Sequence, residues 1–198
     1  MAEYRLRIPL SESDVRRLRV GDIVYLTGVI YTARDAAHRR IVEYLKESKQ
    51  LPFDLGGGVI YHCGPVVAKR DDQWIVLAGG PTTSTRMELY EYEVIEKLGV
   101  RMVIGKGGMG KRTAEACAKY GAVYATYTGG AGVLAAQSIK RVLDVYWLDL
   151  GIPEAVWVFE VEDFGPLVVA IDSTGRNLIE EVVEASTRKK EELLKRPL

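Results

Sequence analysis

The chain has 198 residues, of which 47% are hydrophobic and 27% are charged, and this predicts a globular protein with one substantial core. The 27 Lys and Arg residues balance the 27 Asp and Glu residues, so no field of one sign attracts nucleic acid or an acidic membrane surface. The sequence has no apolar run of about 18 residues and no signal-peptide pattern at residues 1–10, which predicts a cytoplasmic protein that does not span a membrane.

Two cysteines limit the metal chemistry of the chain. Cys63 and Cys117 lie 54 positions apart, form no Cys-x-x-Cys pair and have no histidine spaced to complete a zinc site. We expect buried free thiols and no metal ligands. This chain by itself has too few thiolates for the usual four ligands of an iron-sulfur cluster.

The first part of the chain is predicted to alternate strand, helix and strand. Residues 22–33 (DIVYLTGVIYTA) and 57–64 (GGVIYHCG) have the apolar runs of strands. Residues 34–48 between them carry apolar side chains at helical spacing. Residues 73–80 (QWIVLAGG) are predicted to form a further strand.

That strand leads into a motif rich in hydroxyl groups, GGPTTSTRMELYE at residues 79–91, and then into a helix that closes at Gly99. One hydroxyl among Thr83, Ser84 and Thr85 is predicted to cap the helix. Arg86 in the first turn is unfavourable by about 0.3–1 kcal/mol unless an anion compensates the helix dipole. The motif therefore predicts a helix cap combined with a seat for a carboxylate or phosphate.

A glycine-rich turn, GKGGMG at residues 105–110, lies between a predicted strand (100–108) and a predicted helix (111–121). Its glycines match the dinucleotide pattern G-x-G-x-x-G, but no acidic residue follows about 20 positions later. It also resembles a phosphate loop, although Arg112 stands where serine or threonine would bind magnesium. Nucleotide binding and a simple tight turn both remain open from the residues alone.

The rest of the chain continues the alternation and favours an α/β fold. Residues 122–130 are predicted to form a strand and a turn, and residues 154–177 two strands followed by a polar turn. A charged helix is predicted from Asn177 onward. We therefore expect a single catalytic domain at residues 1–176 and a C-terminal helix at 177–198, packed on the domain or on a partner.

Three cations, Arg34, Arg86 and Lys106, are each placed after a predicted strand. Because open α/β sheets gather ligands at the carboxyl ends of their strands, these cations predict binding of a small di- or trianion. His38 lies on the helical face of Arg34, where a hydrogen-bonded structural role is favoured over a catalytic one. His62, within a predicted strand, is also expected to be structural.

Five segments carry a resemblance to a known family. Taken together and in this order, they resemble the β subunit, or equivalently the C-terminal domain, of the class I iron-sulfur fumarases and the related tartrate dehydratases. The resemblance extends from about Leu6 to Asn177. The segments are TGVIYTARDAAHRR, GGGVIYHCGPVV, GGPTTSTRMELYE, IGKGGMG and YTGGAGVLAAQSIKRV.

The resemblance implies a swivelling β/β/α fold with a mixed sheet and flanking helices. It also implies a partner α subunit that holds a four-iron four-sulfur cluster, a small dicarboxylate substrate, and a higher oligomer of α–β pairs. The expected activity is reversible hydration of fumarate to (S)-malate, a reaction of the tricarboxylic acid cycle, by the assembled pair. Tartrate dehydration is the alternative, and a nucleotide-binding module that uses residues 105–110 is a distant one.

The family's site residues fall on matching positions here. The resemblance implies that Thr82 is the catalytic base and that Arg86, Lys106 and Arg34 bind substrate carboxylates. The sequence departs from the family at Thr85, where many relatives have glycine, and this leaves the conformation of the turn open. We expect supporting roles for the neighbouring residues Asp35, His38, Gly80, Thr83 and Ser84.

Overall fold

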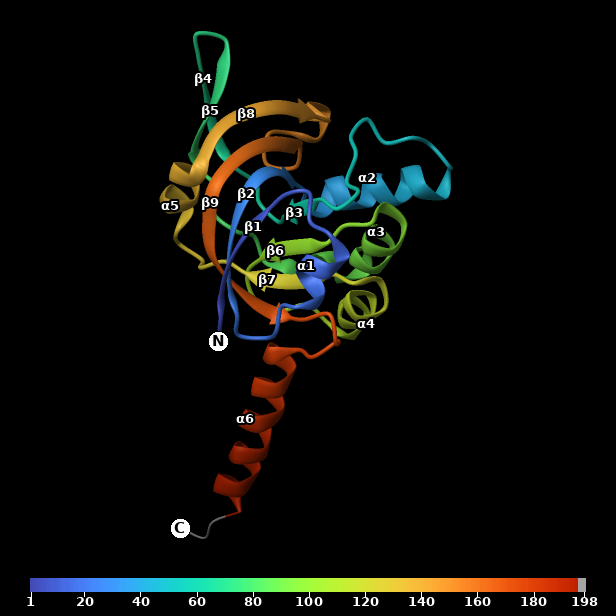
Figure 1. Cartoon of the computed structure of the whole chain (residues 1–198), viewed down its shortest axis with the longest axis vertical. Coiled ribbons are helices and arrows are strands. Elements are labelled where there is room, and N and C mark those ends of the chain that lie inside the picture. The colour runs from blue at the N-terminus through green and yellow to red at the C-terminus, as the bar shows by residue number, and fades with distance from the viewer. Residues whose placement is uncertain (196–198) are drawn as a thin grey trace.

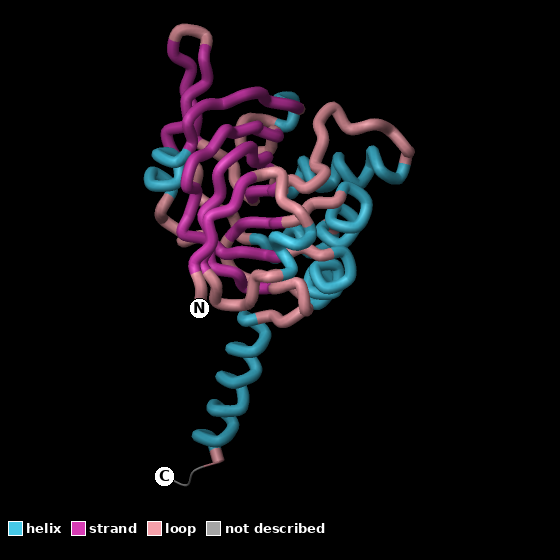
Figure 2. Tube along the Cα trace, in the orientation of Figure 1, coloured by secondary structure: helices cyan, strands magenta, loops and turns pink. Residues whose placement is uncertain are grey.

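The computed structural model describes residues 1–195 (Figure 1), and Figure 2 shows the same view by element type. The strands are β1 (Glu3–Arg7), β2 (Ile23–Thr32), β3 (Val59–Tyr61), β4 (Val66–Arg70), β5 (Gln73–Ala78), β6 (Met102–Gly105), β7 (Val123–Thr126), β8 (Ile139–Tyr146) and β9 (Val156–Ile171). The helices are α1 (Glu12–Arg16), α2 (Asp35–Lys46), α3 (Glu91–Leu98), α4 (Lys111–Tyr120), α5 (Gly132–Ser138) and α6 (Leu178–Leu194), with 3-10 helices η1 (Ser84–Leu89) and η2 (Leu148–Leu150).

Seven strands form one mixed sheet in the order β1-β2-β3-β6-β7-β9-β8. Strands β1, β2, β3, β6 and β7 pair in parallel, whereas β9 runs antiparallel to β2, β7 and β8. The additional pairing of β9 with β2 closes β2, β3, β6, β7 and β9 into a ring. The mixed α/β architecture predicted from the sequence is confirmed.

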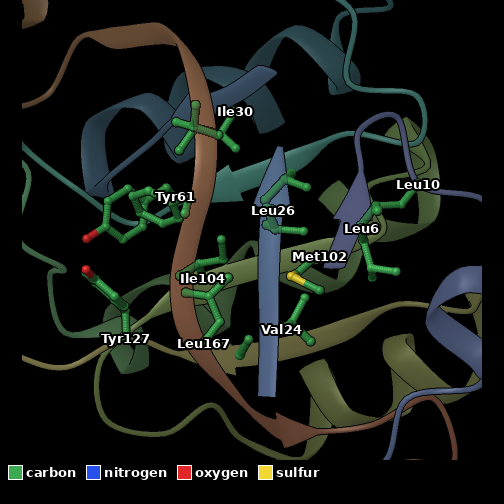
Figure 3. Close-up of a cluster of buried hydrophobic side chains, with 14 of the residues drawn as sticks. Leu6, Leu10, Val24, Leu26, Ile30, Tyr61, Met102, Ile104, Tyr127 and Leu167 are labelled. Carbon is green, nitrogen blue, oxygen red and sulfur yellow. The ribbon is translucent and has the colours of Figure 1, made fainter. Parts of the chain in front are cut away.

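Strands β3, β6 and β7 are buried on both faces apart from the half-buried Thr126, which explains their continuous apolar sequences. In β6, Met102 and Ile104 belong to the core inside the ring, whereas Val103 belongs to a second core under the helices. Figure 3 shows the ring core, with Tyr61 and Tyr127 at one side of its aliphatic residues. Helices α2, α3 and α4 lie together on one side of the sheet, with α5 on the other (Figure 1).

Two predicted elements differ from the structure. Residues 156–171 form one strand rather than two, because β9 pairs with β8 and β2 along most of its length and reaches β7 with its last residues. The predicted strand at 73–80 is present as β5, but it pairs with β4 in a separate hairpin that projects from the body (Figure 1). Strand β5 therefore does not end at the edge of the central sheet.

The parallel strands place four chain segments at one edge of the sheet. The carboxyl ends of β2, β3, β6 and β7 are followed directly by Ala33 and Arg34, by His62, by Lys106 and by Tyr127. This is the edge at which α/β sheets commonly bind ligands.

The helix expected from Asn177 is present and projects from the body (Figure 1). The Asn177 side chain accepts hydrogen bonds from the amides of Ile179 and Glu180 and donates one to the Met109 carbonyl. Beyond this anchor, no residue of α6 is buried. The end of the predicted 177–198 segment, residues 196–198, lies outside the described residues. No helix within residues 1–195 has the length and apolarity to cross a bilayer.

We expect removal of residues 185–198 to change the free energy of unfolding by less than about 0.5 kcal/mol, because residues 185–195 contribute only exposed side chains. Removal from residue 176 onward deletes Asn177 and its bond to Met109 and should cost about 1 kcal/mol or more. Urea unfolding of both truncated chains measures the difference. Equal losses would contradict an anchor at Asn177.

Candidate functional site

The segment Thr82 to Ser84 of the hydroxyl-rich motif inserts between the ends of β3 and β6 in the central sheet, and we call this segment the wedge. The amide of Thr82 donates to the His62 carbonyl at 2.7 Å, and the Thr82 carbonyl accepts from the Lys106 amide at 3.1 Å. The Ser84 amide then donates to the Lys106 carbonyl at 3.0 Å. These backbone bonds place Thr82 and Lys106 side by side, so the motif reaches the strand edge although β5 does not.

Ser84 fills the space above Gly105. A Cβ atom on Gly105 would lie 1.9 Å from the Ser84 hydroxyl oxygen, so no larger residue fits without displacement. The Ser84 hydroxyl is fully buried, 2.9 Å from Nδ1 of His62 and 3.0 Å from the Tyr124 hydroxyl. The first glycine of the GKGGMG turn is therefore required by packing against the motif.

The prediction of a hydroxyl cap on a helix at this motif is wrong. The motif begins the 3-10 helix η1, and the following α-helix starts only at Glu91. Thr83 occupies the N-cap position without a side-chain capping bond. The Thr85 hydroxyl donates instead to the Gly108 carbonyl, since the wedge brings the glycine turn close to the motif.

The anion that Arg86 requires is supplied by the chain. Its Nε and Nη2 atoms donate to the two carboxylate oxygens of Asp35 at 2.8 and 2.9 Å. This hydrogen bond from Arg86 lowers the pKa of Asp35. Nη2 also lies 3.5 Å from the Thr82 hydroxyl oxygen. Arg86 is thus held between the helix that starts after Arg34 and the wedge that carries Thr82.

Arg34 is compensated in a similar way. It is the N-cap residue of α2, and its Nε lies 3.2 Å from Oε1 of Glu154. The other oxygen of Glu154 accepts from the Ala36 amide at 2.9 Å, so this carboxylate also serves the helix start. Gly64 leaves room for the guanidinium, because a Cβ there would lie 2.6 Å from Arg34 Nη1.

Like Arg86, and unlike the half-buried Arg34, Lys106 is exposed. Its aliphatic stem lies against Gly129, where an added Cβ would be 3.4 Å from Lys106 Cδ. Gly129 follows β7, so the turn after a fourth strand contributes to the same surface. Gly80 lies at the entrance of the wedge, and an added Cβ there would meet only Gly132, at 3.6 Å.

The helix that follows the GKGGMG turn already binds a carboxylate. Glu88 accepts hydrogen bonds from the amides of Gly110, Arg112 and Thr113 and from the Thr113 hydroxyl. These are the amides that a phosphate loop or dinucleotide site would offer to its ligand. The structure places an acidic side chain where the nucleotide hypothesis needs a phosphate.

Under the wedge lies a buried cluster of three titratable side chains, His38, Glu91 and His62, none of which is exposed to solvent. Oε2 of Glu91 lies 3.2 Å from Nε2 of His38 and 3.1 Å from Nε2 of His62. Burial opposes the charge of His38, but the Glu91 carboxylate and the Arg34 carbonyl outweigh it and raise the pKa of His38. Burial prevails at His62 and lowers its pKa, and the two imidazoles outweigh burial at Glu91 and lower its pKa to about 2.

The predicted site residues are thus brought together to different degrees. Thr82, Arg86 and Asp35 are in direct contact, and Thr82 and Lys106 are joined through their backbones. Ser84 and His38 lie beneath this surface. His38 belongs to the buried cluster, and Ser84 contacts its member His62. Thr83 is exposed beside Lys106. His62 is buried and contacts Ser84 and Glu91.

Three functional residues were missed by sequence reasoning, namely Glu88, Glu91 and Glu154. Glu88 and Glu91 lie within the last four residues of the motif itself, and the acidic residues that follow its arginine were an available signal. Glu154 lies 120 positions from Arg34, and no spacing rule connects the two.

Comparisons with known proteins place these features in a family context. A family model described as the fumarase C-terminus matches residues 2–182. The putative L(+)-tartrate dehydratase subunit beta of Methanocaldococcus jannaschii is 50% identical over 186 residues, which cover 93% of this chain and 95% of the relative. The L(+)-tartrate dehydratase subunit beta of Escherichia coli is 47% identical over 176 residues, or 89% and 86% of the two chains. A putative class I fumarate hydratase of Geobacillus stearothermophilus is 44% identical over 185 residues, or 93% of this chain and 35% of that longer protein.

The packing of Ser84 on Gly105 predicts the effect of a single methyl group. Gly105→Ala should lower the free energy of unfolding by about 1–3 kcal/mol, because the new Cβ overlaps the Ser84 hydroxyl. Gly80→Ala is the matched control and should stay within about 0.5 kcal/mol. Chemical denaturation of the two variants measures both values, and an equal loss would refute the role of Gly105.

The buried cluster predicts how stability depends on pH. Since the folded pKa of His38 is raised, its contribution is full below the unfolded value near 6.5 and is lost as pH rises through the folded pKa. The lowered pKa of His62 gives the opposite slope. As pH falls from the unfolded value near 6.5 toward the lower folded pKa, the unfolded chain binds a proton that the folded chain does not bind, so stability is lost. Glu91 adds a loss as pH falls from about 4.5 toward 2. The Tm measured by thermal unfolding should therefore be highest near pH 6.5.

The variant Glu91→Gln removes the carboxylate that keeps His38 protonated. The alkaline decrease of Tm should then disappear, while the acid decrease remains. The charge of Asp35 also acts on the cluster, because it favours a raised pKa of His38 and opposes the lowering of the pKa of His62. Burial and then the charge of Glu91 raise the pKa of the neighbouring Cys117 thiol and Tyr124 hydroxyl. An unchanged alkaline limb in Glu91→Gln would assign that limb to another group.

Proposed function

The chain belongs to the fumarase C-terminus family, and from this membership we propose that it is the β subunit of a hydro-lyase for a four-carbon hydroxydicarboxylic acid. One observation carries the proposal. The turns after β2 and β6 and the wedge present Arg34, Lys106 and Arg86 at one edge of the sheet, with the Arg86 guanidinium 3.5 Å from the Thr82 hydroxyl oxygen. Cations on separate turns suit a ligand with a carboxylate at each end.

Arg86 can bind a substrate carboxylate while Asp35 holds its guanidinium in place. A guanidinium has five N–H donors, and Asp35 accepts one from Nε and one from Nη2. The remaining donors include the Nη1 edge, which matches the spacing of a second carboxylate. Asp35 therefore orients the guanidinium toward the ligand.

The charge of these residues suits the reaction. Removal of a proton from the carbon next to a carboxylate builds negative charge on that carboxylate in the transition state. Arg34, Arg86 and Lys106 would stabilise this charge, and because they are already held in place, little reorganisation is needed.

Thr82 is proposed as the group that takes this proton, a role carried over from the family. A neutral hydroxyl is a weak base at its usual acidity. The Arg86 guanidinium at 3.5 Å favours the deprotonated form of the Thr82 hydroxyl electrostatically. Arg86 would thus act on both the base and the substrate.

The residues of this chain do not fit the iron-sulfur cluster of the family. Cys63 and Cys117 are both buried and free, and burial raises the pKa of Cys63 to about 12 and raises that of Cys117 as well. Thiols held in the protonated form are poor metal ligands. We therefore propose that a partner α subunit holds the four-iron four-sulfur cluster, and that α–β pairs form the active enzyme.

Fumarate and (S)-malate are the substrates proposed first. The assigned residues account for two carboxylates and one proton, which is what malate offers. L(+)-tartrate is the second candidate, because it appears in the names of two relatives that match this chain over most of their length. A second hydroxyl would need a further partner, and Thr83 is an exposed hydroxyl beside Lys106.

Reconstitution with an α subunit tests the function. We expect the pair to convert malate to fumarate, followed by absorbance of the product, and the isolated chain to be inactive. A strong preference for L(+)-tartrate would select the second candidate. Turnover by the isolated chain, or stabilisation of the chain by ATP or NAD with none of the pair by dicarboxylates, would contradict the proposal.

Arg86→Ala should lower kcat/KM of the pair by about 100- to 1,000-fold, because a donor to the developing charge is lost. Arg141→Ala is the matched control, since Arg141 is an exposed arginine paired with Glu160 on another part of the surface. Its kcat/KM should remain within about twofold of the wild type. An Arg86→Ala pair with nearly wild-type activity would reduce the Asp35–Arg86 contact to a structural role.

A further inference from the structure

The buried cluster of His38, Glu91 and His62 has no part in the proposed chemistry, yet three elements contribute to it. His38 comes from the first turns of α2, Glu91 is the first residue of α3, and His62 follows β3. All three side chains are inaccessible to solvent. Buried ionisable groups are costly unless they are paired, so the cluster calls for a physical account.

The hydrogen-bond partners determine where the protons lie. Nδ1 of His38 is 2.9 Å from the Arg34 carbonyl, which only accepts, so this nitrogen carries a proton. Nε2 of His38 faces Glu91 Oε2 at 3.2 Å, and two unprotonated acceptors would repel each other at that distance. His38 is therefore an imidazolium ion paired with the Glu91 carboxylate.

His62 completes a continuous chain of donors. Its Nε2 donates to the same Oε2 of Glu91 at 3.1 Å, which leaves Nδ1 to accept from the Ser84 hydroxyl at 2.9 Å. The Ser84 oxygen in turn accepts from the Tyr124 hydroxyl at 3.0 Å. The cluster then holds one anion, one cation and one neutral imidazole, so it has no net charge.

A metal ion at the same place is less favourable. The ligand atoms of His38, His62 and Glu91 lie within 4.8 Å of one another. Within residues 1–195, this cluster therefore offers a metal ion three ligands. A structural zinc ion takes four protein ligands, and a catalytic one keeps an open position. Complete burial denies the cluster an open position.

The cluster reaches each of the three turns that carry the predicted cations. His38 binds the carbonyl of Arg34, and His62 binds Ser84, two residues before Arg86. The Ser84 amide donates to the Lys106 carbonyl, so the link through Ser84 also reaches the turn of Lys106. A single carboxylate is thus connected to every part of the cationic surface.

We propose that Glu91 is a positioning residue, whose buried charge fixes the turns of Arg34, Arg86 and Lys106 relative to one another. The catalytic part of this inference rests on the proposed function, whereas the structural part does not. Glu91 contacts no substrate. It acts through His38 and His62.

The test uses Glu91→Gln, which keeps the shape of the side chain and removes its charge. In the α–β pair, kcat/KM should fall about 100-fold, as expected for misplacement of binding groups by about 1 Å. In the full-length chain, amide hydrogen exchange at His38, Thr82, Ser84 and Lys106 should accelerate together by about tenfold or more, while residues 94–98 keep their protection. Glu93→Gln is the matched control on α3, because Glu93 is partly exposed and pairs with Arg112, and it should leave both measurements unchanged.

A second variant covers the case in which Glu91→Gln does not fold. Ser84→Ala removes the link to the wedge and leaves the ion pair intact. Exchange should then accelerate at the amides of Thr82, of the substituted residue itself and of Lys106, but not at the amide of His38. Acceleration at all four positions, or at none, would overturn the proposed connections.

The outcomes separate this inference from the proposed function. If the wild-type pair acts on neither malate nor tartrate, the function fails, and hydrogen exchange still decides whether Glu91 fixes the turns. Unchanged exchange in Glu91→Gln, or faster exchange with full activity, would overturn the positioning role. One equivalent of zinc in the purified wild-type chain, measured by mass spectrometry, would overturn it in favour of a metal site.

Discussion

The insertion of Thr82 to Ser84 between the ends of β3 and β6 is the constraint on which the site depends. Backbone bonds to His62 on one side and Lys106 on the other hold this segment as firmly as a strand. The motif comes from a hairpin outside the central sheet, so without the wedge its side chains would not meet the strand edge. Because backbone bonds hold the segment, the threonine and arginine side chains remain available for a ligand.

Compensation of charge by the chain itself is the second theme of the site. Asp35 pairs with Arg86, Glu154 with Arg34, and Glu88 caps α4. Each carboxylate orients a cation or a helix start before any ligand arrives. Preorganisation of this kind reduces the cost of binding and of stabilising new charge.

Sequence reasoning succeeded where a local pattern has one structural solution. The strands at 22–33 and 57–64, the helix at 34–48 and the stop at Gly99 follow from periodicity and from a left-handed glycine at the helix end. It failed where tertiary pairing decides. Residues 156–171 have a turn-like interior in sequence, yet pairing with three strands keeps them in one element. The motif hydroxyls suggested a cap, but buried partners and a nearby carbonyl use them instead.

The sequence by itself determined the α/β class and the family through its ordered motifs, because propensity and spacing are local properties. It also predicted an anion beside Arg86, although the helix start on which that prediction rested lies further on, at Glu91. Only the tertiary structure decided which anion that is. Asp35 is 51 positions from Arg86 and Glu154 is 120 positions from Arg34, and no periodicity connects residues at such distances. The same holds for Glu91, whose neighbours His38 and His62 come from other elements. The energy of a buried charge depends on what surrounds it in space, and only the closed sheet and its helices supply those surroundings.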